Sequence, residues 1–248
     1  NNCEVRDDGC WNKSSSKQIK ACMPMHTFGF PCEIDKIVKI CKKYKIEIIE
    51  DAAESLGSFY NNKHTGTFGG LGVLSFNGNK IITTGSGGMI LLKDSKRAML
   101  AKHLTTTGKL PHKWEFNHDM PAYNYRLPNL NASLGITQLS KLNFFLESKR
   151  KLAETYITWG KQNSYHVFQE PNNSLSNYWL NTLIAENNEH KEQLLEVTNQ
   201  HKIMTRPAWT PMHMLPFNSH CQKDDLKNTM WLFERIVNLP SSVPNNDF

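Results

Sequence analysis

The sequence predicts an α/β fold with a mainly parallel sheet in a large domain, followed by a small C-terminal α+β domain. Three features support this: a strand–helix–strand pattern within residues 19–51, a glycine-rich stretch after it, and alternating strand-like and helix-like segments near the C-terminus. The 248 residues are enough for a buried core, and 39% hydrophobic with 21% charged residues is typical of a globular protein. We place the domain boundary near residue 150, which gives domains 1–150 and 151–248.

The first part of the chain has the pattern of a βαβ unit. A short apolar strand is expected over residues 19–25, and a second over 46–49. The helix between them has one apolar face, formed by Ile34, Ile37, Val38 and Cys41. In parallel sheets, ligands bind beyond the C-terminal ends of the strands. Asp51, which follows the second strand, is therefore well placed for chemistry.

A glycine-rich stretch, residues 66–72, leads into an expected strand at 73–76 and a turn that contains Lys80. The apolar segments 81–84 and 89–92 then flank further glycines, a pattern typical of strands joined by tight glycine turns. No G-K-[S/T] follows and no helix begins at these glycines, which excludes a Walker A loop and a dinucleotide fingerprint.

The remainder of the chain is predicted to contain a long helical region and then the small domain. Apolar residues at helical spacing extend from Asn129 to Gln162. Strand-like and helix-like patterns then alternate over residues 181–185, 191–201 and 230–237.

Composition and the absence of targeting signals predict a cytoplasmic protein. The net charge is +6, but the basic residues are scattered, so we expect no nucleic-acid partner. The six cysteines contain no C-x-x-C pair, and residues 213–220 lack zinc-ligand spacing, so reduced thiols and no metal are expected. No apolar run is long enough for a membrane span, and residues 1–20 are too polar for a signal peptide.

Three residue types suit a cofactor that forms an imine. Asp51 and Ser75 precede Lys80 by 29 and 5 residues, and each stands near a predicted strand end. A lysine amine, a carboxylate facing a ring nitrogen and a hydroxyl for a phosphate are what pyridoxal 5'-phosphate (PLP) requires. The same residue types occur together in many unrelated turns, so by themselves they leave other functions open.

Longer strings narrow this choice, because their order and spacing resemble successive motifs of the DegT/DnrJ/EryC1/StrS family of sugar aminotransferases. These strings are His26-Thr-Phe-Gly, Glu50-Asp-Ala-Ala-Glu, Ser75-Phe-Asn-Gly-Asn-Lys, Thr83-Thr-Gly-Ser-Gly-Gly and Tyr123-Asn-Tyr-Arg-Leu. Residues 205–209, 211–213 and 238–242 resemble the nucleotide-sugar branch, nearest to enzymes that aminate UDP-linked 4-keto-6-deoxy-N-acetylhexosamines on routes to legionaminic acid or bacillosamine. The resemblance implies the fold-type I aminotransferase fold, PLP as cofactor, and glutamate as donor of the amino group placed on C4 of the sugar.

Carried over by position, the resemblance implies a role for five residues. Lys80 would be the catalytic Schiff-base lysine, and Asp51 the partner of the pyridine nitrogen. Glu54 stands where family members place Gln, His or Glu near the cofactor hydroxyl, and Ser75 would bind the phosphate. Asn124 would reach the phosphate in the neighbouring subunit, which implies a homodimer with shared active sites.

For several of these residues a structural role is the alternative. Ser75 is then an ordinary strand hydroxyl and Asn124 a turn residue, while His26 either packs a loop or lines the site. Arg206 and His213 are candidates to approach the nucleotide-sugar, with surface or packing roles as the alternative.

Two functional alternatives stay open at this point. A PLP-dependent sugar dehydratase shares the fold, but those relatives replace the lysine with histidine. A non-catalytic sensor or scaffold would keep the fold without turnover. Family members carry a sizeable segment that would lie before residue 1, so the resemblance implies that residues 1–150 are the C-terminal part of the large domain.

Overall fold

The computed structural model describes residues 2–244, which fall into two compact units. The first unit contains the chain up to Phe144 together with Pro171–Asn177, and the second contains Phe145–Glu170 and the chain from Tyr178. The chain therefore passes from the first unit to the second after Phe144, returns to the first for Pro171–Asn177, and then re-enters the second. The two domains predicted with a boundary near residue 150 stay a prediction.

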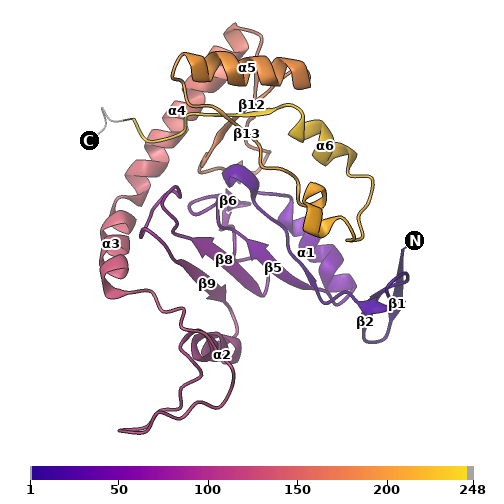
Figure 1. The fold of residues 1–248 in the computed structure, drawn as a ribbon, viewed down its shortest axis with the longest axis vertical. Coiled ribbons are helices and arrows are strands. Elements are labelled where there is room, and N and C mark those ends of the chain that lie inside the picture. The colour runs from indigo at the N-terminus through magenta and orange to yellow at the C-terminus, as the bar shows by residue number, and fades with distance from the viewer. Residues whose placement is uncertain (1, 245–248) are drawn as a thin grey trace. The chain divides into compact units, whose positions relative to one another are not determined.

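The central sheet of the first unit has the strand order β4-β5-β8-β9. Strands β4, β5 and β8 are parallel, and β9 runs antiparallel to β8 along the edge (Figure 1). Their bounds are Ala21–Cys22, Glu47–Asp51, Leu71–Ser75 and Gly88–Leu92. The predicted α/β fold with a mainly parallel sheet is confirmed for this unit.

Helix α1, Ile34–Lys43, covers one face of the sheet with the predicted apolar residues. Ile34 and Cys41 are buried against Ile48 of β5 and against Tyr60. The Tyr60 hydroxyl donates to the Asp35 carboxylate at 2.9 Å, which gives the buried ring a polar partner. Burying these apolar side chains is the main source of stability for the βαβ unit.

The structure corrects the strand expected at residues 81–84, which form no strand. These residues instead lie in a loop that folds back on the end of β8, where the Thr84 N–H donates to the Phe76 carbonyl at 3.0 Å. The segment 89–92, in contrast, belongs to β9 as expected.

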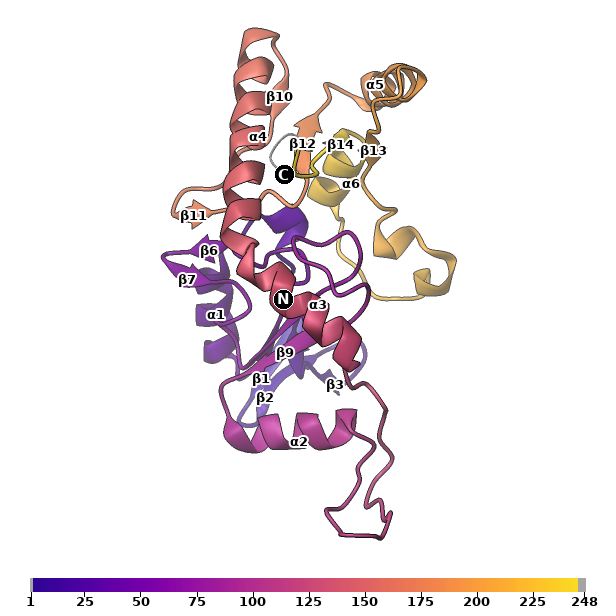
Figure 2. The ribbon, with the colours of Figure 1, turned by 90° about the vertical axis from the view of Figure 1, so that its left-hand side faces the viewer.

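Short elements and two helices complete the first unit. Antiparallel strands β1–β3 form a hairpin-like sheet at the N-terminal end, and β6, β7 and β11 form another. A long loop, residues 106–128, separates α2 from α3 and extends away from the central sheet (Figure 2). The bounds are β1 Cys3–Arg6, β2 Gly9–Asn12, β3 Lys17–Gln18, η1 Thr27–Gly29, β6 Phe59–Tyr60, β7 Lys63–His64, α2 Ser95–Thr105, α3 Asn129–Ser140 and β11 Ser174–Leu175.

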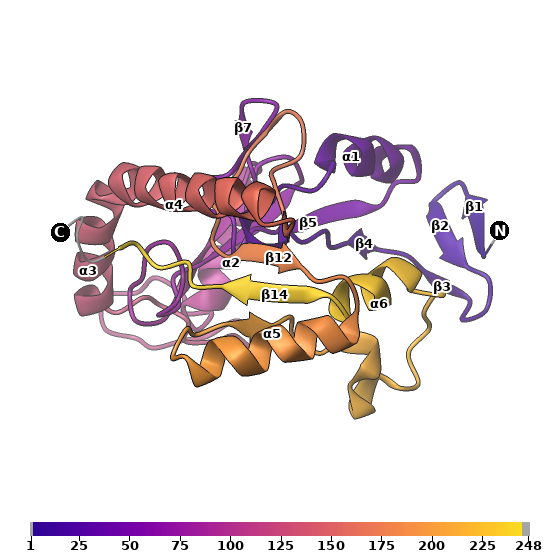
Figure 3. The same ribbon diagram turned by 90° about the horizontal axis from the view of Figure 1, so that it is seen from above.

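The second unit has an antiparallel sheet in the order β10-β12-β14-β13, with helix α5 lying along it (Figure 3). Its core contains Leu183, Ala185 and Val237, with Leu194 and Leu195 of α5 packed against them. The predicted helical region 129–162 is confirmed, although Lys141 divides it into α3 and α4. The bounds are α4 Leu142–Gln162, β10 His166–Val167, β12 Asn181–Ile184, α5 Asn188–Gln200, β13 Arg206–Pro207, η2 Met212–Met214, η3 Pro216–Asn218, α6 Lys227–Phe233 and β14 Ile236–Leu239.

Candidate active site

Asp51 is the last residue of β5 and lies on the sheet face opposite to α1. In parallel strands, paired residues point to the same face, and alternate residues point to opposite faces. Asp51 pairs with Val73, so Ser75, two residues further along β8, shares its face. Asp51 is half-buried, and its carboxylate accepts the Ala53 N–H at 3.1 Å. The fold thus brings the two predicted cofactor residues Asp51 and Ser75 to one face of neighbouring strands.

Lys80 projects from a loop that is closed at its base by backbone hydrogen bonds. The Phe76 N–H donates to the Gly87 carbonyl at 2.9 Å, and the Lys80 N–H donates to the Asn77 carbonyl at 3.0 Å. The Ser75 hydroxyl accepts the Asn77 N–H at 3.3 Å, so the strand end and the lysine turn are linked. These hydrogen bonds fix the backbone of the loop and so restrict the positions that the Lys80 amine can reach.

Glu54 and Lys80 form an ion pair at the site. The Lys80 Nζ is 3.6 Å from Glu54 Oε1, and the two side chains are 14% and 6% exposed, so solvent screens this pair far less than a surface pair. The other Glu54 oxygen accepts the Phe28 N–H at 2.7 Å. Sequence reasoning placed Glu54 near the cofactor, but the contact with Lys80 appears only in the structure.

The pKa of Glu54 is raised above its ordinary value. Burial is the largest cause, and the nearby Asp51 charge also raises this pKa, while the Phe28 N–H and Lys80 act in the opposite direction. The charges of Asp51 and Lys80 therefore both act on Glu54. Asp51, Glu54 and Lys80 form one electrostatically connected group.

Asn124 belongs to the loop between α2 and α3. Its residue is exposed, and its backbone pairs with Thr106 at the base of the 106–128 loop. The proposed contact with a phosphate in a second subunit stays a prediction.

His26 is fully buried, and its imidazole contacts Glu50 and Cys32, so in the described chain it packs loops together. Arg206 is exposed and donates to Asn199 at 2.9 Å, whereas His213 is half-buried in η2. Both belong to the second unit, and their approach to a nucleotide-sugar stays a prediction.

Sequence reasoning missed two buried polar residues that support the site. Glu50, completely buried, was passed over beside Asp51, although a carboxylate inside an apolar strand is itself a signal. Asn177 lies 123 positions after Glu54 and donates to its carbonyl at 2.9 Å. No local pattern in the sequence predicts that second contact.

Comparison with known proteins decides the family. The family model described as the DegT/DnrJ/EryC1/StrS aminotransferase family matches residues 12–246. The chain belongs to this family. The resemblance found in the sequence motifs is thereby confirmed.

Three relatives illustrate the family's range. GDP-perosamine synthase of Escherichia coli O157:H7 is 34% identical over 95% of this chain and 66% of its own length. The structure of PseC, a Helicobacter pylori aminotransferase involved in the biosynthesis of pseudoaminic acid, is 25% identical with a TM-score of 0.86, over 90% of this chain and 62% of that one. The structure of the E. coli GDP-4-keto-6-deoxy-D-mannose-3-dehydratase with bound hydrated PLP is 26% identical with a TM-score of 0.80, over 92% and 64%. The chain therefore spans just under two thirds of each of these proteins.

The donor set of this aminotransferase-family chain fits PLP. The family implies this cofactor, and the first unit offers an amine, two carboxylates and a hydroxyl at the ends of β5 and β8. The Lys80 amine is only partly exposed and faces a carboxylate, an arrangement suited to a lysine that exchanges protons. Separately, no helix in residues 2–244 is long and apolar enough to cross a membrane.

Proposed function

We propose that the protein is a PLP-dependent aminotransferase that transfers an amino group from glutamate to C4 of a nucleotide-linked, UDP-type 4-keto-6-deoxy sugar. The observation that carries this proposal is the group of Lys80, Glu54 and Asp51 in a chain of the sugar aminotransferase family. An aminotransferase needs a lysine that exchanges a proton and a carboxylate that keeps the ring electron-poor, and the group contains both.

Each residue of the site has a distinct task. PLP, when bound, supplies an aldehyde that takes up amino groups and a ring that withdraws electrons. Lys80 Nζ holds the cofactor and moves the proton to and from the sugar C4. The Asp51 carboxylate keeps a proton on the ring nitrogen, because a nearby negative charge favours the charged form. Ser75 Oγ binds the phosphate.

The proposal includes a homodimer with shared active sites, to which Asn124 contributes. Large apolar side chains are exposed around the loop that carries Asn124, and Tyr123 and Tyr125 stack there at 5.1 Å between ring centroids. Many exposed large apolar side chains on consecutive segments favour an interaction surface there. The exposed residues are Trp114, Phe116, Tyr123, Tyr125, Leu130, Ile136 and Leu139.

A PLP-dependent sugar dehydratase is the second candidate, because one of the structural relatives catalyses that reaction by its name. The resemblance disfavours it, since dehydratases of this family replace the lysine with histidine and this chain has Lys80. The relative named GDP-perosamine synthase makes GDP-linked sugars the first alternative to UDP-linked ones.

The test combines product identification with a lysine variant. The PLP-loaded protein is incubated with glutamate and UDP- and GDP-linked 4-keto-6-deoxy sugars, and the products are identified by mass and NMR. We expect an amino sugar, with borohydride fixing the cofactor to the Lys80 peptide. Lys80→Ala should lose both, and Lys102→Ala, an exposed lysine of α2, should keep both. Activity of Lys80→Ala within about tenfold of the parent, a barrier change of ~1.4 kcal/mol, would show that the lysine is wrongly assigned.

A further inference from the structure

The Glu50 carboxylate binds a whole loop through its backbone. Glu50 is completely buried in β5. Its Oε2 accepts the Gly66 N–H at 2.7 Å, and its Oε1 accepts the N–H groups of Phe68 at 2.5 Å and Gly69 at 2.6 Å. Three donors from the loop that precedes β8 therefore converge on one carboxylate, and hydrogen bonds to a charged acceptor are the strong ones.

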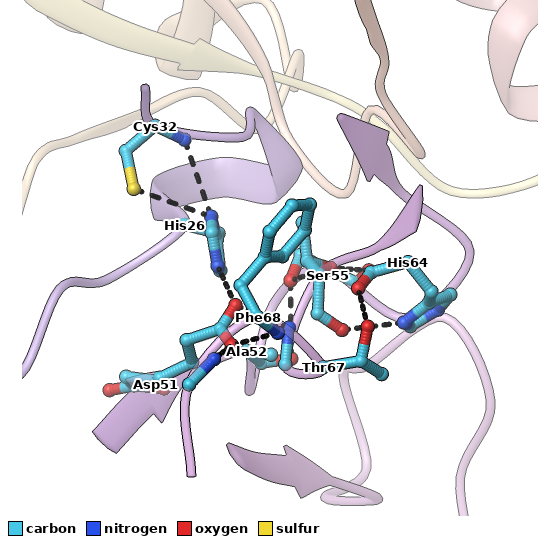
Figure 4. A network of polar contacts seen from close by, with 12 residues as sticks. His26, Cys32, Asp51, Ala52, Ser55, His64, Thr67 and Phe68 are labelled. Carbon is cyan, nitrogen blue, oxygen red and sulfur yellow. Dashed lines mark hydrogen bonds and ion pairs between the residues drawn. The ribbon is translucent and has the colours of Figure 1, made fainter. Parts of the chain in front are cut away.

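His26 supplies a fourth donor from the other side of β5. Its Nε2 lies 3.1 Å from Glu50 Oε2, and its Nδ1 accepts the Cys32 N–H at 3.3 Å. Because Nδ1 accepts, the proton of a neutral imidazole is on Nε2 and points at Glu50. Figure 4 shows His26 joined to Cys32 by dashed lines on one side and directed toward the strand on the other.

The Glu50 carboxylate is charged at neutral pH. Burial is the largest single influence and raises its pKa, but the hydrogen bonds from His26, Gly69 and Gly66 together outweigh burial and lower the pKa below its ordinary value. A buried anion that is stable in this way depends on its donors remaining in place.

The loop bound by Glu50 is packed tightly against the sheet. A Cβ at Gly72, the residue paired with Glu50, would lie 2.1 Å from the Gly66 carbonyl oxygen. A Cβ at Gly69 would lie 2.7 Å from the Ile48 carbonyl oxygen. Only glycines allow this close approach, which brings the loop N–H groups within reach of the carboxylate.

Backbone hydrogen bonds from the segment that contains His26 hold Asp51, the residue next to Glu50. The Asp51 N–H donates to the Pro24 carbonyl at 2.9 Å, and the Asp51 carbonyl accepts the His26 N–H at 3.1 Å. His26 therefore bonds both to the Glu50 side chain and to the Asp51 backbone. On its other side β5 is paired with β8, to which the bound loop leads.

We propose that Glu50 is a positioning residue for Asp51: its buried carboxylate holds His26 and the 66–69 loop on the two sides of the β5 end and so fixes the direction of the Asp51 carboxylate. Neighbouring side chains on a strand point to opposite faces, so Glu50 serves the site from the far face of the sheet. The proposal rests on the proposed function, in which Asp51 faces the cofactor ring nitrogen.

The substitution Glu50→Gln tests the role of the charge at nearly constant shape. A glutamine amide nitrogen has no free lone pair, so it would face backbone N–H groups that it cannot accept. Glu47→Gln is the matched control, because Glu47 lies on the same strand but is 39% exposed and pairs with Arg97 at 3.1 Å. His26→Gln is a milder variant that removes the imidazole and keeps the carboxylate.

The first measurement is amide hydrogen exchange in the protein without cofactor. We expect the Gly66, Phe68 and Gly69 amides to exchange at least about tenfold faster in Glu50→Gln, as expected when a hydrogen bond worth ~1.4 kcal/mol is lost. The rates in Glu47→Gln should match those of the parent. Equal exchange in Glu50→Gln and the parent would overturn the role of Glu50 in holding the loop. Where Glu50→Gln does not fold, His26→Gln takes its place in the double-mutant cycle, because it removes one of the donors to the carboxylate and leaves the loop donors in place.

The second measurement is a double-mutant cycle that combines Glu50→Gln with Asp51→Asn. The Kd for PLP and kcat are measured for each of the four proteins. If Glu50 acts through Asp51, Glu50→Gln should weaken each quantity by about 10–100-fold in the parent, the effect typical of residues that orient a ligand, and by less than about threefold beside Asp51→Asn. If the effect of Glu50→Gln on the Kd and kcat is the same with and without Asp51→Asn, the positioning role is overturned. An Asp51→Asn protein that behaves like the parent would instead refute the Asp51 part of the proposed function, and the exchange result would still report on Glu50.

Discussion

Lys149 gives the stability of the second unit a predictable dependence on pH. This lysine of α4 is buried, and its Nζ donates to two backbone carbonyls, those of Trp179 at 3.2 Å and of Ser241. Burial lowers the pKa of Lys149 from 10.5 to about 8, because an apolar surrounding disfavours the charged amine. Both acceptors are neutral and compensate only part of this cost.

The sign follows from proton binding in the two states. Between pH 8 and 10.5 the unfolded chain keeps the Lys149 proton that the folded protein has lost. Stability rises with pH wherever the unfolded state binds more protons. The contribution of Lys149 to the free energy of unfolding is therefore least favourable at pH 7. It becomes more favourable by about 3 kcal/mol between pH 8 and 10.5, taking 1.36 kcal/mol for each pKa unit.

The assay is urea unfolding of the parent and of Lys149→Met at pH 7, 8, 9 and 10. We expect the free energy of unfolding of the parent, relative to that of the variant, to increase by about 2–3 kcal/mol over this range. Lys151→Met, at an exposed position of the same helix, is the control. Its free energy of unfolding should change with pH in the same way as that of the parent. Burial also raises the pKa of Cys32 and Cys41, but these thiols are common to all three proteins and cancel in the comparison. A difference between the parent and Lys149→Met that is constant with pH, or that moves in the opposite direction, would refute the reasoning.

Three further predictions concern the proposed active site. Asp51→Asn should leave the circular dichroism spectrum and melting temperature close to the parent and lower kcat by several orders of magnitude; a near-normal kcat would exclude its role at the ring nitrogen. Mixing Lys80→Ala with Asn124→Asp chains should restore part of the activity once subunit exchange between tagged chains is shown, since one hybrid site then has both native residues; a mixture as inactive as its parents would place Asn124 outside the partner's site. Glu54→Gln should keep activity within about tenfold, a barrier change of ~1.4 kcal/mol, whereas Glu54→Leu should lose more, and equal losses in steady-state assays would contradict this.

The parts of the fold that the sequence predicts best are those with a periodic apolar pattern. Residues Ile34 to Cys41 repeat at helical spacing, and the helix buries that face against β5. Asp51 was placed correctly at a strand end because the apolar run before it stops there. Helix α2 has no buried residue and hence no apolar face to detect, and only its Asp94 N-cap, which accepts the Arg97 N–H at 2.7 Å, gives a local signal.

Contacts between distant segments account for what the sequence did not predict. Residues 81–84 are β-branched and apolar enough to form a strand, but Thr84 bonds back to Phe76 and its carbonyl accepts the Asn131 amide of α3. These tertiary contacts satisfy the backbone and outweigh the local β propensity. The hydrogen bonds around Glu50 are likewise invisible in the sequence, because their donors are backbone N–H groups that every non-proline residue has.

Glu54 links the electrostatics of the structure to the chemistry of the proposed site. While the Lys80 amine is charged, it lowers the pKa of Glu54 and partly offsets the effects of burial and of Asp51. Without that positive charge, burial and Asp51 are opposed by the Phe28 N–H hydrogen bond, and the Glu54 pKa rises further. Glu54 then takes a proton more readily, and in its protonated form it is a neutral donor and acceptor like glutamine. Because a glutamine at this place also has an oxygen for the Phe28 N–H, the physical argument explains why Glu54→Gln should be tolerated while an apolar residue of similar size should not.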